Sequence, residues 1–559
     1  MPNRRFAFTL ASSLADLGLE HVCISPGSRN TPLIAGFAAE SRITKWPVLD
    51  ERSAGFFALG LARATGLPVA VACTSGTAAV EYHPAVVEAD LSDVPLLVLT
   101  ADRPEELRGR GAPQTIDQIS LYGTAVRMFA DALVPDEDTP AEAAAETAVD
   151  IWAHATTSPP GPVHLNLPFR EPLLEADWAV APPRLERIER STEPHPDLAP
   201  IAADLTGRRG LIVAGRSHDP DFPAACAELA AIAGFPIIAD PLSGLRFGTH
   251  RQDHVLAYGD RLAAAGVLDM LRPEVVVRFG PIPTSKPTWT WLERHPDVNQ
   301  ILIDIQSRDA TSSARTILEI DPGAAARSLT SSITAAAPAG WSKSWLDLDT
   351  SAAEALSQLE FPSEPAIARL VTEAAPNGSA LTLGSSMPIR DVDGFAGKHT
   401  RHLRMFGNRG ANGIDGVVSS GLGAAAAGLN TIILVGDVSL FHDLNAIGTA
   451  AQLGLPVTVV VVNNNGGGIF HFLPQSDESI LEPDVFERFL ATPHGTDFVP
   501  VAESLGAEAY ETADPAELRT LVSNPTERPR LIQVRTDRAA NLDLHRSLDE
   551  AVRRAVGVT

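Results

Sequence analysis

Short apolar runs rich in Val, Ile and Leu alternate with longer helical patterns along the whole chain of 559 residues. Strands buried on both faces read as continuous apolar runs, and their alternation with helices indicates parallel α/β domains. The pattern therefore predicts three doubly wound parallel-sheet domains. The runs in the three blocks are HVCIS (21–25), PVAVACTS (68–75) and VPLLVLTA (94–101); GLIVAG (210–215), PIIAD (236–240), VVVRFG (275–280) and ILIDI (301–305); and ALTLGSS (380–386), TIILVG (431–436), PVTVVVVN (456–463) and RLIQV (530–534).

The segments between the blocks lack a sustained apolar period. Segment 174–200, rich in Pro and Glu, is typical of a linker, and the Ala- and Pro-rich segment 334–340 opens the second connection. A chain of this length exceeds what one hydrophobic core supports. We therefore expect domains over residues 1–180, 196–335 and 355–559.

The N-terminal segment superficially resembles a secretory signal, because Arg4 and Arg5 precede an apolar run. Its apolar residues recur at helical spacing, Asp16 and Glu20 fall on the polar side, and no small-residue cleavage site follows. We interpret the segment as an amphipathic helix of the first domain. No stretch of the chain has the ~18 uninterrupted apolar residues of a membrane span.

Composition adds a location and excludes one class of partner. Cys23, Cys73 and Cys226 lie in apolar or helical segments without a CxxC pair, which is typical of reduced core residues in a cytoplasmic protein. The net charge of −25 argues against a nucleic-acid partner, because phosphate binding needs a basic face. An acidic protein that binds anions must build local positive sites, so Arg and Lys residues at strand ends become candidate binding residues.

Two neighbouring strands of the third block end in oxygen ligands. Asp437 follows TIILVG, a helix pattern spans about 440–453, and Asn464 follows the next strand. In a βαβ unit both side chains emerge at the same edge of the sheet. Asp437, Asn464 and the carbonyl of Gly466 are therefore candidate ligands of Mg²⁺, with Mn²⁺ as the alternative metal. The simpler alternative is a helix-capping Asp and an Asn-rich turn.

This Gly-Asp pair, followed after a helix and a strand by Asn-Asn, resembles the thiamine-diphosphate enzyme superfamily, although Val438 stands where most members have Gly. The superfamily's glutamate, which hydrogen-bonds the aminopyrimidine ring, matches Glu51, for which a surface helix cap is the alternative. A carboxyl group among apolar residues has a raised pKa and suits that catalytic role. The resemblance implies thiamine diphosphate, bound by Glu51, Ile414, Gly436, Asp437, Val438, Ser439, Asn464, Gly466, Gly467 and Ile469.

The segment GLGAAAAG (421–428) looks like a dinucleotide-binding fingerprint. It follows no clean strand, and no acidic residue lies at the right distance after it. We therefore interpret it as a site of close helix packing.

The resemblance extends over essentially the whole chain to one family, 2-succinyl-5-enolpyruvyl-6-hydroxy-3-cyclohexene-1-carboxylate (SEPHCHC) synthase. It is carried by ISPGSRNTPL (24–33), DERSAGFFALGLA (50–62), TSGTAAVEYHPAVVEA (74–89), TADRPEELRGRGAPQTIDQ (100–118), GSSMPIRD (384–391), GNRGANGIDG (407–416), GDVSLFHDLNAI (436–447) and NNNGGGIFHFLP (463–474). It implies the thiamine-diphosphate-binding fold, with a pyrimidine-binding first domain, a central domain and a diphosphate-binding third domain. It also implies a homodimer or a dimer of dimers, with sites between subunits.

The family decarboxylates 2-oxoglutarate and adds the succinyl-semialdehyde carbanion equivalent to isochorismate in a 1,4-addition, releasing CO₂, in menaquinone biosynthesis. Both substrates are dianions, and the sequence independently places cations suited to carboxylates after four strands, at Arg29, Arg103, Lys286 and Arg390. Pro287 stands where some members have a second basic residue. By resemblance the substrate-binding residues are Ser28, Arg29, Arg103, Gln114, Lys286, Ser386, Arg390, Phe470 and Leu473.

Simpler interpretations exist for each of these residues. A single strand-end Arg is more often a surface ion-pair partner, Ser386 is a candidate helix cap, and Phe470 with Leu473 has the helical spacing of core residues. The rival functions are a simple 2-oxo acid decarboxylase or acetohydroxyacid synthase, an oxidase with a flavin site in the central block, and a non-catalytic regulator. The four cations, the lack of a flavin motif and the presence of Glu51 and Asp437 favour the synthase.

Overall fold

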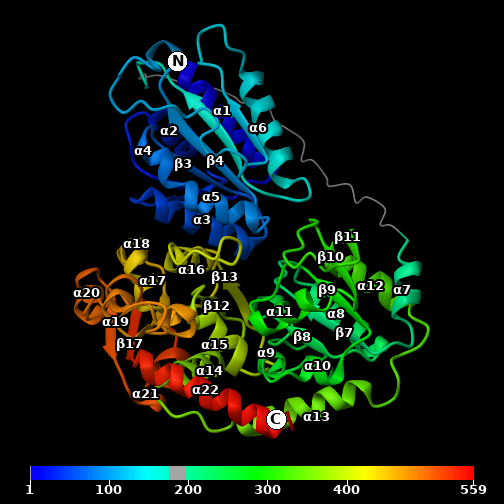
Figure 1. The fold of residues 1–559 in the computed structure, drawn as a ribbon. Coiled ribbons are helices and arrows are strands. Elements are labelled where there is room, and N and C mark those ends of the chain that lie inside the picture. Colours follow the sequence, from blue (N-terminus) through cyan, green and yellow to red (C-terminus); the bar gives the residue numbers. More distant parts are fainter. Residues whose placement is uncertain (1, 175–196, 559) are drawn as a thin grey trace.

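The computed structural model describes residues 2–174 and 197–558. These residues form three parallel sheets flanked by helices (Figure 1). The predicted fold class is therefore confirmed. The linker predicted over 174–200 lies almost wholly outside the described residues, and the predicted domain boundaries stay predictions.

The first sheet has the strand order β2-β1-β3-β4-β6-β5. Its strands are β1 (His21–Ile24), β2 (Thr44–Pro47), β3 (Val69–Cys73), β4 (Leu96–Asp102), β5 (Met128–Asp131) and β6 (Val163–Pro168). Its helices are α1 (Pro2–Leu17), α2 (Thr31–Ala39), α3 (Glu51–Thr65), α4 (Thr77–Glu81), α5 (His83–Leu91) and α6 (Ala141–Thr156). The expected N-terminal amphipathic helix is α1, which buries Leu10 and Leu14.

The second sheet has the order β11-β10-β9-β7-β8. Its strands are β7 (Gly210–Ala214), β8 (Ile237–Ala239), β9 (Val275–Phe279), β10 (Asn299–Asp304) and β11 (Thr316–Glu319). Its helices are α7 (Ala199–Leu205), α8 (Phe222–Ala233), α9 (Gly259–Ala264), α10 (Val267–Leu271), α11 (Lys286–Arg294) and α12 (Pro322–Ser332), and α13 (Trp341–Ala355) leads to the third sheet.

The third sheet has the order β13-β12-β14-β15-β17-β16, which repeats the strand order of the first. Its strands are β12 (Ala380–Leu383), β13 (Arg404–Gly407), β14 (Thr431–Gly436), β15 (Val457–Asn463), β16 (Glu508–Glu511) and β17 (Arg530–Arg535). Its helices are α14 (Glu364–Ala374), α15 (Met387–Phe395), α16 (Val417–Ala426), α17 (Asp437–His442), α18 (Asn445–Leu453), α19 (Pro483–Phe486), α20 (Phe498–Ser504), α21 (Pro515–Ser523) and α22 (Arg538–Ala555).

The single helix predicted over about 440–453 is wrong, because two helices, α17 and α18, occupy this part of the chain. The backbone leaves the helical region at Asp443, where φ is −134°. The Asp443 carboxylate accepts hydrogen bonds from the backbone N–H of Ser419, at 2.7 Å, and from its hydroxyl, at 2.8 Å. The helix is interrupted where this side chain turns to bind α16.

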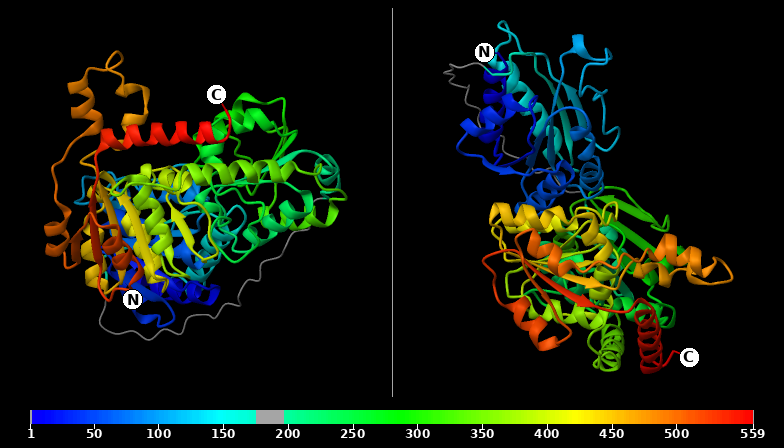
Figure 2. Two further views of the ribbon diagram at one scale, coloured as in Figure 1. Left: turned by 90° about the horizontal axis from the view of Figure 1, so that it is seen from below. Right: turned by 90° about the vertical axis from the view of Figure 1, so that its left-hand side faces the viewer.

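Helices α3 and α16 join the first domain to the third, and their backbones lie in direct contact (Figures 1 and 2). Asp50 caps the start of α3 by accepting from Ser53 N–H, and Gly66 ends the helix in the left-handed conformation at φ 71°. A Cβ atom at Gly60 would lie 1.9 Å from the carbonyl oxygen of Ser420, and one at Gly423 would lie 2.2 Å from that of Phe57. The interpretation of 421–428 as a close-packing segment is confirmed.

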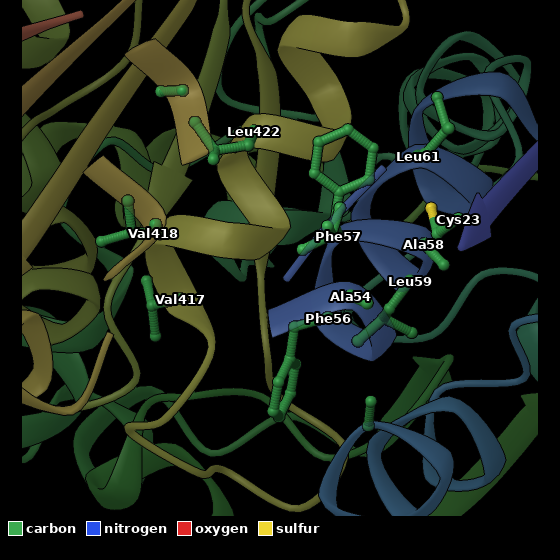
Figure 3. Packing of buried hydrophobic residues seen from close by; sticks show 14 of the residues in the cluster. Cys23, Ala54, Phe56, Phe57, Ala58, Leu59, Leu61, Val417, Val418 and Leu422 are labelled. Carbon is green, nitrogen blue, oxygen red and sulfur yellow. The ribbon is translucent and has the colours of Figure 1, made fainter. Parts of the chain in front are cut away.

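Apolar side chains from both domains surround this contact and form one continuous core (Figure 3). Phe57 and Leu61 from α3 lie with Val418 and Leu422 from α16, and all four are buried. Cys23 belongs to the same cluster, and all three cysteines are buried free thiols, as expected.

Within residues 2–174 and 197–558, no helix combines the length and the apolar character needed to cross a membrane.

We expect Gly60→Ala to destabilise the protein by about 1–3 kcal/mol, because the added methyl group forces the two helices apart. The shift in melting temperature, measured by scanning calorimetry, tests this. Gly448→Ala is the matched control: Gly448 lies inside α18, and its added Cβ would meet only a leucine methyl at 3.6 Å. That control should be neutral or gain about 0.5–1 kcal/mol from helix propensity. Equal melting temperatures for the two variants would contradict the packing argument.

Candidate functional site

A cavity lies at the carboxyl edge of the third sheet, where β12, β14 and β15 end side by side. The strand order reverses between β12 and β14, which is the position where open α/β sheets bind ligands. Asp437 and Asn464 both line it, so their predicted meeting at one edge is confirmed. The predicted residues brought together in the lining are Ser386, Ile414, Gly436, Asp437, Val438, Ser439, Asn464, Gly466, Gly467, Ile469 and Phe470.

The Asp437 carboxylate is buried and held in one orientation by backbone donors. It accepts hydrogen bonds from the N–H of Val438, at 2.7 Å, and from the N–H of Gly466, at 2.9 Å. Its Oδ2 atom also lies 3.1 Å from Nε2 of His494. A carboxylate fixed by its neighbours in this way is preorganised to bind a cation.

The amide of Asn464 is anchored on one side only. Its Nδ2 donates to Oε1 of Glu364 at 2.7 Å, whereas its buried Oδ1 has no hydrogen-bond partner within the described chain. Buried acceptors without a partner are rare and call for an explanation such as an ion. Beside the Asp437 carboxylate, this free oxygen fits a Mg²⁺ ion, which prefers oxygen donors.

The cavity also leaves room for a larger group. A Cβ atom at Gly436 would meet no heavy atom within 4 Å, so this glycine faces open space at the end of β14. Ile414 and Phe470 supply apolar lining, and the Ile414 carbonyl accepts a hydrogen bond from the Ser439 hydroxyl. The residues present therefore fit a cofactor that joins an anionic, metal-bound end to a ring that packs against apolar side chains.

Two buried acids in the lining escaped the sequence reasoning. Glu364 begins α14, and burial together with the neighbouring charge of Asp391 raises the pKa of its carboxyl group. Asp391 is 2% exposed and lies 3.1 Å from Nε2 of His545. Glu364 follows Ser363, and Ser-Glu at the start of a helix normally signals an exposed cap, so its sequence carries no sign of this position.

Three of the predicted substrate residues gather at the carboxyl edge of the first sheet. Arg103 donates to the carbonyl of Gln114 at 2.8 Å and also to the Ser75 hydroxyl. Burial and the charge of Arg29 lower the pKa of Arg103, so the two cations are close. Arg29 itself is 8% exposed and forms an ion pair with Glu171 at 3.1 Å.

The other predicted residues are more dispersed. Ser28 is exposed beside Arg29, and Lys286 is exposed at the first position of α11. Leu473 follows the short helix Gly468–Phe472 and lies outside the cavity lining, whereas Phe470 lies in it. Ser386 precedes α15, but its side chain makes no capping hydrogen bond.

Arg390 has a cationic neighbour that the sequence reasoning missed. Arg390 and Arg409 both donate to the carbonyl of Ser385, at 2.9 Å and 3.2 Å. Burial and the charge of Arg409 lower the pKa of Arg390. Arg409 lies two residues after the end of β13. The available signal was therefore its position at a strand end, but the apolar run of β13 is weak and does not mark the strand in the sequence.

Glu51 begins α3 and does not line this cavity. Its neighbour Arg52 donates to the carbonyl of His442, at the opposite end of α17 from Asp437 and roughly 8 Å away along the helix axis. Burial, followed by the charge of Asp50, raises the pKa of Glu51. Within one chain, Glu51 is therefore not one of the residues that line the cavity.

Two family models match the chain. Residues 4–121 match the N-terminal TPP binding domain of thiamine pyrophosphate enzymes, and residues 396–534 match the C-terminal TPP binding domain. With three parallel sheets and an oxygen-lined cavity at the switch point of the third, the protein is a thiamine-diphosphate-dependent enzyme.

Curated relatives narrow this class. The 2-succinyl-5-enolpyruvyl-6-hydroxy-3-cyclohexene-1-carboxylate synthase of Geobacillus kaustophilus is 42% identical over 99% of this chain and 98% of its own length. The synthases of Chloroflexus aurantiacus and Halobacterium salinarum are 42% and 40% identical, covering 96% and 100% of this chain and 94% and 99% of their own lengths. The chain belongs to the SEPHCHC synthase family.

We expect Glu364→Leu to weaken Mg²⁺ binding about 10–100-fold, because the Asn464 amide loses the acceptor that fixes its orientation. Titration calorimetry of Mg²⁺ into protein with thiamine diphosphate measures the change. Glu373→Gln is the control, since Glu373 lies on the same helix and pairs with Arg519 at the surface. An unchanged affinity in Glu364→Leu would show that Asn464 needs no such anchor.

Proposed function

We propose that this chain decarboxylates 2-oxoglutarate and adds the succinyl-semialdehyde carbanion equivalent to isochorismate, giving SEPHCHC and CO₂ in menaquinone biosynthesis, with thiamine diphosphate and Mg²⁺. The observation that carries the proposal is identity with SEPHCHC synthases over nearly the full chain, combined with the cavity that holds Asp437 and Asn464. When bound, thiamine diphosphate supplies the electron sink for decarboxylation.

We assign the metal to Asp437, Asn464 and the carbonyl of Gly466. The preorganised carboxylate and the unpartnered amide oxygen support this assignment. Among the described residues, no group of three or more His, Cys, Asp and Glu side chains is arranged to hold a metal, and this site needs only one carboxylate. Gly436, Val438, Ser439 and Gly467 would hold the cofactor's diphosphate in this proposal, and Ile414, Ile469 and Phe470 would pack against its ring.

Glu51 is the proposed catalytic acid. Its raised pKa favours the protonated carboxyl group, which can donate a hydrogen bond to the aminopyrimidine ring. Apolar lining such as Phe470 keeps water from the reacting carbon, where an early proton would release succinic semialdehyde instead of product.

The substrate carboxylates require cations, and the proposal assigns them by position. Ser386 lines the cofactor cavity, and Arg390 donates a hydrogen bond to its carbonyl. Because 2-oxoglutarate reacts with the cofactor before isochorismate does, we assign this pair to the carboxylates of 2-oxoglutarate. Ser28, Arg29, Arg103, Gln114 and Lys286 are the proposed isochorismate contacts. Arg409, which shares the Ser385 carbonyl with Arg390, adds a further cation to this set.

The active unit in this proposal is a homodimer in which each site combines two chains. The cavity lining comes entirely from residues 364–470, and Glu51 of the same chain is not part of it. Exposed apolar side chains flank Glu51 and α17, including Leu49 (68% exposed) and Phe441 (50% exposed), and a second copy would cover them. A dimer of dimers preserves the same pairing.

We also propose a cytoplasmic location, supported by the unpaired cysteines.

With thiamine diphosphate, Mg²⁺, 2-oxoglutarate and isochorismate, we expect the purified protein to form SEPHCHC, identified by mass spectrometry, only when both substrates are present. Glu51→Gln should lower the rate about 10²–10⁴-fold, because the ring loses its proton donor. Release of CO₂ from pyruvate without an adduct from isochorismate would contradict the assigned substrates and leave the thiamine chemistry standing.

Mixing two inactive variants tests the shared site. A dimer of one Glu51→Gln chain and one Asp437→Ala chain contains one intact site if each site takes Glu51 from one chain and Asp437 from the other. After denaturation and refolding of an equal mixture, we expect about a quarter of wild-type activity. Each variant refolded alone is the control. No recovery from a mixture that forms dimers would place each site within one chain.

A further inference from the structure

A loop of the third domain is seated on a buried carboxylate of the first. Glu88, on α5, accepts hydrogen bonds from two successive backbone N–H groups, those of Gly410 at 2.9 Å and Ala411 at 2.7 Å. Glu88 is 2% exposed. Both carboxylate oxygens are used in this contact, so the loop is held in position and in orientation.

Arg63, on α3, completes the attachment. Its guanidinium pairs with Glu88 at 2.5 Å and donates to Oδ1 of Asn408 at 2.7 Å, so one cation bridges the acid and the loop. Burial alone would raise the pKa of Glu88, but the charge of Arg63 and the loop N–H of Gly410 lower it, which favours the ionised carboxylate. A charged acceptor forms the stronger hydrogen bonds to the loop.

The loop is also in contact with the end of α5 and with its own sheet. A Cβ atom at Gly410 would lie 2.7 Å from the Ser92 hydroxyl and 2.8 Å from the Leu91 side chain, so only glycine permits this approach. From the other side, the Ser385 hydroxyl donates to the carbonyl of Asn408 at 2.7 Å. The loop is thus clamped between the first domain and the end of β12.

Arg409 is the residue between these anchors. Its backbone is bracketed by Asn408 and Gly410, and its guanidinium donates to the Ser385 carbonyl beside Arg390. A small displacement of the loop would move the Arg409 charge away from its position next to Arg390. Such displacements are costly for binding because bidentate carboxylate recognition depends on geometry.

We propose that Glu88, with Arg63, is a positioning residue that sets Arg409 for carboxylate binding through the loop 408–411. The inference rests on the proposed function. Glu88 touches no substrate in this arrangement and acts from the first domain on a cation of the third.

Kinetics of three single variants test it, with the KM values of 2-oxoglutarate and isochorismate measured separately. Glu88→Gln should raise the KM for at least one of them about tenfold, while kcat per cofactor-loaded site stays within about twofold. Gly410→Ala should also raise this KM about tenfold, because the added methyl group pushes the loop away from α5. This variant leaves the ion pair between Arg63 and Glu88 intact. Glu40→Gln is the matched control: Glu40 is a buried acid of the same domain, paired with Arg42 at 2.7 Å and 6% exposed.

A double-mutant cycle with Arg409→Met separates positioning from general stability. If Glu88 acts through Arg409, the double variant Glu88→Gln/Arg409→Met has the KM of Arg409→Met alone. Additive effects on KM, or a loss confined to the fraction of folded enzyme, would overturn the proposal. Wild-type protein that forms no adduct from both substrates would refute the proposed function, whereas normal turnover with an unchanged KM in Glu88→Gln would refute only the positioning role.

Discussion

The backbone contact between α3 and α16 is the constraint on which the arrangement of domains depends. Gly60 and Gly423 let the two helices approach until carbonyl groups occupy the space of a side chain. The same approach lets Asp443 accept from the Ser53 hydroxyl on α3 and brings α5 to the loop 408–411. The domains that supply Glu51 and Asp437 are therefore joined by a contact with almost no freedom of adjustment.

Binding chemistry gathers where parallel strands end, and it differs between the sheets. At the third sheet a fixed carboxylate and a free amide oxygen suit a cation. At the first sheet Arg29 and Arg103 lie close enough to affect each other, which suits an anion. An acidic chain can still offer a local positive site where cations converge, because the potential there is set mainly by the charges that lie closest to it.

The strongest sequence signals were those with continuous apolar runs. Strands β14 and β15 and their terminal residues could be predicted because Val and Ile fill them without interruption. Strand β6 was missed because buried His164 and Asn166 interrupt it, and these are satisfied by Thr100 and Gln118 from distant segments. Glu364 was missed for a related reason, since only the folded chain brings it to Asn464. Partners far apart in sequence leave no periodic trace.

The repeated strand order has a consequence for how one backbone plan carries different chemistry. Strands β3, β9 and β14 occupy the same place in their sheets. The turns that follow them diverge: Ser75 lies two residues after β3, Pro281 lies two residues after β9, and Asp437 directly follows β14. The first contacts Arg103 and the last contacts Gly466, whereas the proline has no N–H to offer. Related parallel sheets thus present different chemical groups in the turns that follow corresponding strands.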